Sequence, residues 1–396
     1  MVAAYLFLDY VRPQELIPIL GYARISGIIF LMTSIWGALH FRKTLLNTPL
    51  VILLLLSVLF LISGIGAVNV SSYKLAMKFF LGFLLQCAAI YIVIDTKERI
   101  LAVTNWWCLI YMLMGFITIA KGGMGPGDFT RDQNDAALAL LIGIPWVFYS
   151  MSMPGLDRFQ RWLRWLTLCI LIAAVVVSRS RGGFLGLVAV MLTIWWFSQN
   201  RLRNAVVMTI GALVLGGVLV SVLPQGYIEE MGSISSREDS TRVERLRGWE
   251  VAWLIFKHNP IIGVGGGNFA WNVSRYQRQA SWWTGEQKSL AGRKAHSLYF
   301  QVLADLGAAG AILYIYIMFV VPWKLNKVRN KLKANIDEER IVKNLVQILI
   351  ASMVAIAVSG AFISVAYYPH IPIWVTMYAI VKRYYEQRLG ESGHNI

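Results

Sequence analysis

The chain contains few charged residues and very little cysteine. Only 15% of its 396 residues are charged, and its three cysteines, Cys87, Cys108 and Cys169, all lie within apolar stretches. No CxxC pair occurs, so the sequence excludes a disulfide framework and a CxxC-based zinc or redox motif. Acidic residues are also scarce, because 21 aspartates and glutamates face 37 lysines and arginines, for a net charge of +16. This excess of positive charge reflects either a nucleic-acid partner or membrane topology.

Motifs for nucleotide or metal chemistry are missing from the sequence. There is no HExxH, no D-x-D pair and no GxxxxGK(S/T). The glycine-rich stretch GVGGGNF, residues 263–269, follows a helix-and-proline segment rather than a strand, which indicates a tight loop and not a dinucleotide fold. Without a nucleotide site, the free energy for any reaction must come from the substrate itself.

Apolar residues, by contrast, dominate the chain. They make up 57% of it, and the mean hydropathy is +0.58, which is typical of membrane proteins. Stretches that can cross a hydrocarbon core of about 30 Å recur along most of the length. They cover residues 17–40, 48–68, 73–95, 99–120, 135–153, 163–178, 182–198, 204–223, 296–322, 342–366 and 370–385. Residues 1–8 are too few to span alone and lack a cleavage site, which favours an uncleaved insertion signal. The predicted fold class is all-α, a polytopic membrane bundle of about 11–12 transmembrane helices.

The basic residues alternate between loops in a way that predicts orientation. One alternating set of loops holds 19 of them, and the opposite short loops hold seven. Because short loops rich in lysine and arginine stay in the cytoplasm, the first set is predicted to be cytoplasmic. It comprises Arg42, Lys43, Lys97, Arg99, Arg158, Arg161, Arg164, Arg201, Arg203, the run from Lys324 to Lys343, Lys382, Arg383 and Arg388; the outer set comprises Arg12, Lys74, Lys78, Lys121, Arg131, Arg179 and Arg181. Topology explains 19 of the 37 basic residues, so nucleic acid is not an expected partner.

One long outer loop divides the chain. We expect N-terminal transmembrane helices over residues 1–223, a periplasmic loop with an amphipathic helix over 224–295, and C-terminal transmembrane helices over 296–396. The loop has 72 residues, is too long for a simple connector, and lacks the composition of a disordered segment. It carries five tryptophans, Trp249, Trp253, Trp271, Trp282 and Trp283, so we expect it to fold onto the membrane surface and to carry function.

The stretch STRVERLRGWEVAWLIFKHNP, residues 240–260, predicts a helix within this loop. Thr241 and Glu244 form a capping-box pattern, and Pro260 follows the predicted end. An apolar face comprising Val243, Leu246, Trp249, Trp253 and Phe256 suits a helix lying along the bilayer or under a lid. The first two turns also contain Arg242, Arg245 and Arg247, where the helix dipole is already positive. Their charge is unfavourable there unless an anionic ligand, or Glu238, Asp239 and Glu244, offsets it.

Arginines and a histidine on the outer side are the candidate site residues. Guanidinium groups bind phosphate oxygens in a bidentate way, so Arg179 and Arg181, together with the loop arginines, suit a lipid-linked diphosphate. The alternative is that Arg179 and Arg181 reach the interface or bind phospholipid headgroups. His296 lies where the loop re-enters the membrane, and its neutral imidazole can take a proton from an acceptor hydroxyl. A structural hydrogen-bonding role is the alternative for His296, and His370, in the outer turn YYPH, is its rival.

Four stretches resemble one family in their order and spacing. They are RDQNDAALALLIGIP, VVSRSRGGFLGL, RLRGWEVAWLIFKHNPIIGVGGGNF and AHSLYFQVLADLG, between about residues 128 and 310. Together they resemble the bacterial superfamily of O-antigen ligases, O-antigen polymerases and protein O-oligosaccharyltransferases. The N-terminal YVRPQELIP also resembles members that carry a ligase assignment by sequence alone, which favours a ligase over a polymerase.

The resemblance implies inverting glycosyl transfer from undecaprenyl diphosphate at the periplasmic face of the bacterial inner membrane, without metal, nucleotide or other cofactor. It implies that Arg181 and Arg245 bind the diphosphate and that His296 is the general base. Arg179, Arg242 and Arg247 are added because they lie nearby. The acceptor is a glycan, a lipid such as the lipid A core, or a protein. The family often has asparagine after the histidine where this chain has Ser297, so the partner that orients His296 is left open.

Other kinds of function are also open at this point. Outer carboxylates, namely Asp128, Asp132, Asp135 and Glu250, leave a metal site as an alternative, although nothing requires one. A transporter of lipid-linked glycans would also have many spans, but paired half-helices with matched breaks are lacking and few acidic residues lie within spans. A non-catalytic assembly factor would use the tryptophan-rich loop for docking. Transport should need an ion gradient, and docking should survive substitution of His296.

Overall fold

The computed structural model describes residues 2–17, 19, 25–40, 49–206, 209, 240–333 and 336–389. Within these ranges every regular element is a helix and none is a strand, which confirms the predicted all-α fold class. Most of the predicted span at 204–223, and the first part of the predicted loop up to residue 239, lie outside the described residues.

Every predicted span within the described residues corresponds to a helix. The helices of the bundle are α4 (Ile25–Leu39), α5 (Val51–Ser63), α6 (Val70–Val93), α7 (Lys97–Ala120), α8 (Gln133–Ser150), α9 (Arg158–Val177), α10 (Arg181–Phe197), α15 (Leu298–Ile315), α16 (Val321–Lys331), α17 (Asp337–Gly360) and α18 (His370–Leu389). A π-helical turn at Tyr316–Val320 joins α15 to α16. Two short helices, α1 (Val2–Tyr10) and α2 (Pro13–Leu16), precede α4.

Five of these helices are long and apolar enough to cross a membrane: α6, α7, α9, the continuous α15–α16 and α17. Three shorter apolar helices, α4, α5 with its following turn, and α10, accompany them. A helix rises about 1.5 Å per residue, so the 24 residues of α17 extend over about 36 Å, which exceeds a hydrocarbon core of about 30 Å. The protein is therefore a polytopic membrane helix bundle.

α8 and α17 form the centre of the bundle. Nearly every residue of α8 from Asp135 to Ser150 is buried, and α8 packs against α7, α9, α10 and α17. A helix that is apolar on all sides can lie inside a bundle or against lipid, and the burial of α8 shows that it lies inside. The beginning of α8 and the end of α17 lie at the same end of the protein, so groups attached there are held by its most buried helices.

Small residues let α10 pack closely against both central helices. A Cβ atom on Gly183 would lie 2.7 Å from the Cβ of Ala137 in α8, and one on Gly182 would lie 3.2 Å from the Cβ of Phe362, just after α17. The hydroxyl of Ser359 in α17 donates to the carbonyl oxygen of Gly182 at 3.1 Å. Small residues at such contacts are the usual means of tight packing between membrane helices.

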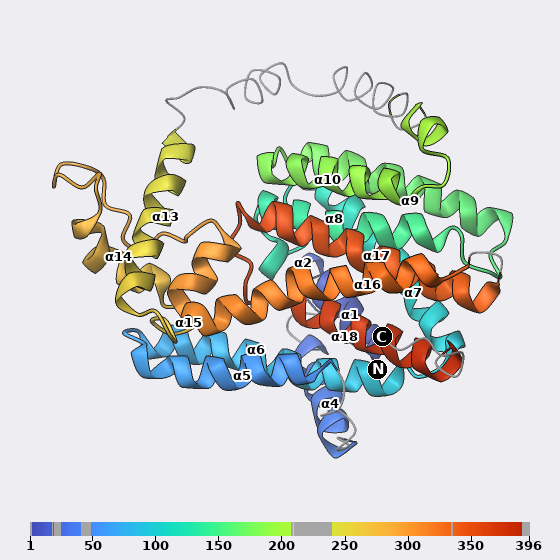
Figure 1. Ribbon diagram of the computed structural model, residues 1–396, viewed down its shortest axis with the longest axis horizontal. Coiled ribbons are helices and arrows are strands. Elements are labelled where there is room, and N and C mark those ends of the chain that lie inside the picture. The colour runs from blue at the N-terminus through green and yellow to red at the C-terminus, as the bar shows by residue number, and fades with distance from the viewer. Residues whose placement is uncertain are drawn as a thin grey trace.

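A small helical unit, which we call the outer unit, covers one end of the bundle and lies at the left in Figure 1. It consists of α13 (Ser240–His258), α14 (Phe269–Tyr276) and the segment 277–297. The unit has an apolar core of its own, completed by the beginning of α15. That core is formed by Val251, Ala252, Ile255, Val264, Phe269, Val273, Tyr276, Ala280, Leu290, Ala295 and Ala304. We call the end of the bundle beneath it the outer end.

Two details of α13 differ from expectation. The helix begins one residue before Thr241, so Thr241 lies in the first turn and is not its N-cap. The predicted apolar face is also only partly packed against protein, because Leu246 and Trp253 are 50% and 43% exposed while Ala252 and Ile255 are buried. Smaller residues let α13 approach α15 closely. The larger apolar side chains are left on the outside, where lipid is available to a membrane protein.

The GVGGGNF stretch forms a tight loop between α13 and α14, as predicted. Hydrogen bonds hold this loop against α15. The carboxylate of Asp305 in α15 accepts hydrogen bonds from the N–H groups of Gly267 and Phe269 at 3.1 and 2.7 Å. It also accepts one from the hydroxyl of Tyr367 at 2.8 Å. The N–H of Gly265 donates to the carbonyl oxygen of Asp305 at 2.9 Å. Sequence reasoning did not foresee this role of Asp305.

Gly307 makes the contact between the loop and α15 possible. It interrupts α15 with φ 63° and ψ −159°, a conformation that is accessible to glycine but not to residues with a side chain. A Cβ atom there would lie 2.5 Å from the carbonyl carbon of Ile261 and 2.8 Å from the nitrogen of Gly263. After the kink, the N–H of Ala308 donates to the carbonyl oxygen of Pro260 at 2.8 Å.

We expect Gly307→Ala to lower the free energy of unfolding by about 3–5 kcal/mol, because it combines backbone strain with steric overlap. Gly292→Ala is a matched control, since its φ is 78° but nothing lies within 4 Å of the new Cβ. The control should lose only about 1–2 kcal/mol. Denaturant unfolding in detergent measures both, and equal losses would show that the contact between the loop and α15 adds no stability.

Candidate active site

The turn between α9 and α10 holds Arg179 and Arg181 at the outer end. Ser180 caps α10, because its hydroxyl oxygen accepts the N–H of Gly183 at 2.9 Å. The same hydroxyl donates to Oδ1 of Asn134, at the beginning of α8, at 2.8 Å. Arg181 is the first residue of α10 and is half-buried, whereas Arg179 is exposed and has a φ of 53°. The turn is thus anchored to the central helix α8.

Arg181 and His296 lie on either side of the outer end of α17. Gly360, the last residue of α17, approaches α15 so closely that a Cβ there would lie 3.4 Å from the Cβ of Leu298, two residues after His296. On the other side, the glycine that follows Arg181 contacts Phe362. One helix end therefore fixes the positions of both backbone segments.

α13 docks onto the chain just before α15 through Trp249. The indole N–H of Trp249 donates to the carbonyl oxygen of Ala295 at 3.1 Å, and its ring stacks on Phe300 with centroids 5.2 Å apart. Arg245 is four residues before Trp249, so it shares this face of the helix, and it is half-buried. Arg242 continues the same row one turn earlier and is exposed.

Arg247 does not join this row. Two residues correspond to about 200° of helix rotation, so Arg247 faces away from Arg245. Its guanidinium lies 5.0 Å from the ring centroid of Trp282. The carboxylate of Glu250 accepts hydrogen bonds from the N–H and hydroxyl of Ser281 at 2.6 and 3.0 Å. This face of α13 therefore packs against the segment around residue 282. Arg247 had been grouped with Arg245 because the two are close in sequence, but two residues along a helix point in nearly opposite directions.

His296 lines a small pocket between α13 and the segment that leads into α15. Glu244 and Gly248 form the α13 side of the pocket, Arg293 and Lys294 lie beside His296, and the remaining walls are apolar. His296 is exposed and has a φ of 49°, in the left-handed region that non-glycine residues seldom occupy. The backbone therefore holds the imidazole at the rim of the pocket in an unusual conformation.

The surroundings lower the pKa of His296. Partial desolvation of the imidazole is the largest cause, and the positive charges of Arg245, Lys294 and Arg293 act in the same direction. Asp132, at the beginning of α8, acts in the opposite direction and raises the pKa. Arg245 and Asp132 are thus both within electrostatic reach of His296. A lowered pKa keeps the imidazole neutral, which is the form that accepts a proton.

Two carboxylates at the beginning of α8 join the surroundings of His296. Asp132 caps α8 by accepting the N–H of Asn134 at 2.9 Å. Asp135 accepts a hydrogen bond from the hydroxyl of Tyr368 at 2.9 Å and attracts Lys294 electrostatically. Sequence reasoning considered these carboxylates only as alternative metal ligands. The sequence RDQND could have indicated that these two carboxylates act together, because acids three residues apart at the start of a helix share a face.

The rival histidine, His370, lies inside the bundle. It is 5% exposed, its Nδ1 lies 3.3 Å from the hydroxyl of Tyr10, and its ring packs edge-on against Phe129 at 5.3 Å. His258 is exposed at the far end of α13. His394 falls outside the described residues, and so does the side chain of Asp128. Within the part of the chain that the structure describes, no group of three or more His, Cys, Asp or Glu side chains is arranged to hold a metal ion.

These features define an all-helical, multi-pass membrane protein with a basic, histidine-containing site where a small outer unit meets the bundle. Residues 166–315 match the family model of O-antigen ligase. The matched segment runs from α9 to α15 and confirms the resemblance seen in the sequence. It supports glycosyl transfer of the O-antigen ligase or polymerase type, with a lipid-linked glycan donor and an acceptor as its partners in general terms. No curated protein matches the chain.

Proposed function

We propose that this protein transfers a glycan from undecaprenyl diphosphate to an acceptor hydroxyl, on the lipid A core or a similar molecule, at the periplasmic face of the inner membrane. The observation that supports this most directly is that Arg245 lies within electrostatic reach of His296 at the beginning of the α15–α16 span, within the segment that matches O-antigen ligase. A polymerase, which would use a second lipid-linked glycan as acceptor, is the alternative.

Guanidinium groups bind the diphosphate in this proposal. Arg245 is half-buried on the packed face of α13 next to His296, and Arg181 is half-buried across the end of α17. Fixed donors in a poorly hydrated site stabilise the negative charge that develops on a departing diphosphate. Arg179 and Arg242 are exposed, so in this proposal they bind the more solvent-exposed phosphate oxygens or attract the donor as it approaches the site. Arg247 is assigned to the packing of Trp282.

His296 acts as the general base. Its neutral imidazole takes the proton of the acceptor hydroxyl while the hydroxyl oxygen attacks the anomeric carbon from the side opposite the diphosphate. The new bond between carbon and oxygen forms as the bond from the anomeric carbon to the diphosphate breaks, and the electron pair leaves with the diphosphate. The configuration at the anomeric carbon is therefore inverted.

Asp132 compensates the charge that His296 gains. When the imidazole becomes a cation, it stands near Arg245, Arg293 and Lys294, which repel it. Asp132 is the carboxylate whose attraction opposes them, and its position is fixed because it caps α8. Asp132 is therefore a candidate for the group that orients His296, which the sequence left open because Ser297 stands where the family often has asparagine.

Purified wild-type protein is expected to transfer a glycan from undecaprenyl diphosphate with no nucleotide and with a chelator present. The diphosphate is the leaving group, so no further source of free energy is needed. Parallel incubations with lipid A core and with lipid-linked glycan as acceptors, followed by a gel-shift assay, separate ligase from polymerase. An absolute requirement for nucleotide or divalent metal, or for an ion gradient across the membrane, would refute the proposal.

Transfer is expected to retain its rate to lower pH than an ordinary histidine would allow. The base form exists above the folded pKa, and the surroundings of His296 lower that pKa from about 6.5. The rate should therefore begin to fall only at a pH below this ordinary value. The profile of kcat/KM against pH measures this, and an acidic limb centred above pH 7 would contradict the assignment of His296.

A further inference from the structure

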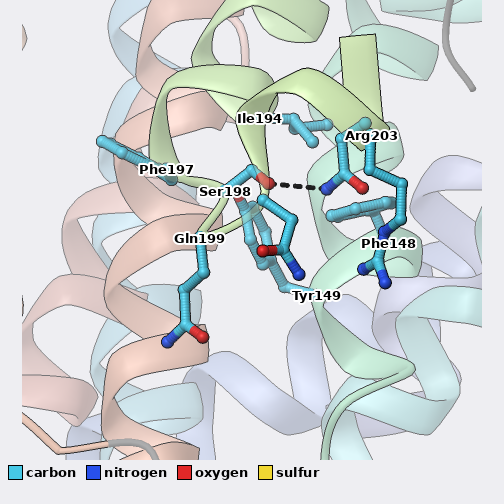
Figure 2. A pocket seen from close by; sticks show the side chains of 9 residues that line it. Phe148, Tyr149, Ile194, Phe197, Ser198, Gln199 and Arg203 are labelled. Atoms are coloured by element: carbon cyan, nitrogen blue, oxygen red, sulfur yellow. Dashed lines mark hydrogen bonds between the residues drawn. The ribbon is translucent and has the colours of Figure 1, made fainter. Parts of the chain in front are cut away.

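A second pocket lies at the end of the bundle opposite the outer unit. It has a volume of about 200 Å³ and lies between the end of α8, the end of α10 and the connector 198–204. Figure 2 shows Tyr149, Ser198 and Arg203 gathered around it. At about 30 Å³ per water molecule, the space corresponds to about seven waters, which is enough for a small polar group. This pocket is separate from the site around His296.

The lining of the pocket selects for an anion. Arg203 provides a guanidinium, and Gln199, Asn200 and Asn204 provide amides that donate hydrogen bonds. No carboxylate is among the lining residues within the part of the chain that the structure describes. The hydroxyl of Ser198 accepts one N–H of Asn204 at 2.6 Å and keeps its own proton to donate. Such a set of donors with one cation and no acid matches phosphate oxygens.

Tyr149 places an unpartnered hydroxyl on this pocket. Its side chain is 6% exposed, and its buried hydroxyl oxygen has no hydrogen-bond partner among the described residues. Buried polar groups in proteins are almost always hydrogen-bonded, so this hydroxyl needs a partner, and the pocket that it lines is where one fits.

Further guanidinium groups surround the pocket. Arg329 of α16 lies 3.9 Å from the ring centroid of Phe197, a lining residue, and interacts electrostatically with Tyr149. Arg201 lies 4.8 Å from the ring centroid of Trp196. Their positive charge extends the attraction for an anion beyond the pocket itself.

The outer surface of α10 leads from this pocket along the bundle. Leu185, Val188, Leu192 and Trp196 recur at helical spacing on one face, and each is 41–57% exposed. In a helix of a membrane bundle, such a stripe faces lipid. An acyl chain can lie along this stripe while its headgroup occupies the pocket at the end of α10.

We propose that this pocket binds the phosphodiester headgroup of an anionic phospholipid in the membrane leaflet at the end of the bundle opposite the outer unit. Arg203 contacts the phosphodiester, and Tyr149 donates its hydroxyl to a headgroup oxygen. Basic pockets between membrane helices on the cytoplasmic side commonly bind such headgroups, and the basic loops predict that this end is cytoplasmic. The proposal is independent of the transfer reaction at the outer end.

Native mass spectrometry of the full-length protein in an uncharged detergent tests this. Wild-type protein is titrated with phosphatidylglycerol and, in parallel, with phosphatidylcholine, whose headgroup carries no net charge. We expect phosphatidylglycerol to bind about ten-fold more tightly or better, because the lining contains a cation and no acid. Equal binding of the two lipids would overturn the proposal.

Two variants and a control locate the site. Arg203→Gln should weaken phosphatidylglycerol binding about ten-fold and Tyr149→Phe about three-fold. Arg161→Gln removes an exposed charge near the same end, outside the pocket, and should leave binding unchanged. If Arg203→Gln behaves like Arg161→Gln, the pocket is not the site.

A thermal-shift measurement separates a lipid from free phosphate and guards against misfolding. Tyr149→Phe removes a buried hydroxyl without a partner, so without added lipid it should melt no lower than wild type. Phosphatidylglycerol should raise the Tm of wild type more than that of Tyr149→Phe. Inorganic phosphate alone should give no comparable rise, and an equal rise would mean that the pocket takes free phosphate and not a lipid.

Discussion

Replacing His296 by asparagine is expected to lower the transfer rate about 10²–10⁴-fold while the protein keeps its fold. Asparagine lacks a group that accepts a proton near neutral pH. It tolerates the left-handed backbone better than alanine does, and His296 has a φ of 49°. The asparagine variant therefore removes the base with little change in backbone strain, whereas His296→Ala would combine both effects. Initial rates with saturating donor, and the Tm in detergent, measure the two properties separately.

His258→Asn is the matched control for this prediction. His258 is exposed near the end of α13, and its Nδ1 lies 2.9 Å from the carbonyl oxygen of Leu254, within the same helix. Its replacement should leave the rate unchanged. If His296→Asn transfers glycan at the wild-type rate, the assignment of the base is wrong, whatever the outcome for Arg181 and Arg245.

The membrane helices could be predicted because the physics of lipid is restrictive. A chain in hydrocarbon must satisfy its backbone hydrogen bonds internally, so an apolar stretch of about 20 residues becomes a helix. The helix in the outer loop could also be predicted, because Pro260 marks its end. Its arginines stand out in the sequence as candidates, because their charge conflicts with the helix dipole.

The sequence indicated that the apolar face of α13 suits the bilayer, but it did not show which small residues pack against α15. In a soluble protein the largest apolar face normally points to the core, but here lipid is a second apolar environment. Leu246 and Trp253 are exposed for this reason, while Ala252 meets the core of the outer unit. The roles of Asp305 and Asp132 were also hidden, because each depends on a contact between segments far apart in the sequence.

The outer end stores backbone strain at candidate site residues. Among the described residues, three that are not glycine have a positive φ: Arg12, Arg179 and His296. Each such conformation costs about 1–3 kcal/mol and persists only where the surroundings enforce it. Arg179 precedes the cap of α10, and His296 precedes α15, so both lie beside the packed end of α17. Strain at these candidate residues fits the proposal of a site whose geometry is fixed before the substrate binds.

Replacing Arg245 by methionine is expected to lower transfer about 10²–10³-fold, because a donor aimed at the developing charge is lost. Arg245→Lys should recover part of this, since lysine keeps the charge but not the bidentate geometry. Arg247→Met is the matched control from the opposite face of α13. It removes a contact with Trp282 and should change the rate less than about three-fold, with at most a small loss of stability.

Arg245 has a second effect that the pH profile can separate from the first. Its charge lowers the pKa of His296, so Arg245→Met should raise that pKa and move the acidic limb of the profile to higher pH. At a pH well above both pKa values, His296 is neutral in the variant as in the wild type. A loss of rate that persists there reports missing stabilisation of the diphosphate. A loss that disappears there would mean that Arg245 acts only through His296, and the diphosphate would then have to be bound by Arg181 and its neighbours.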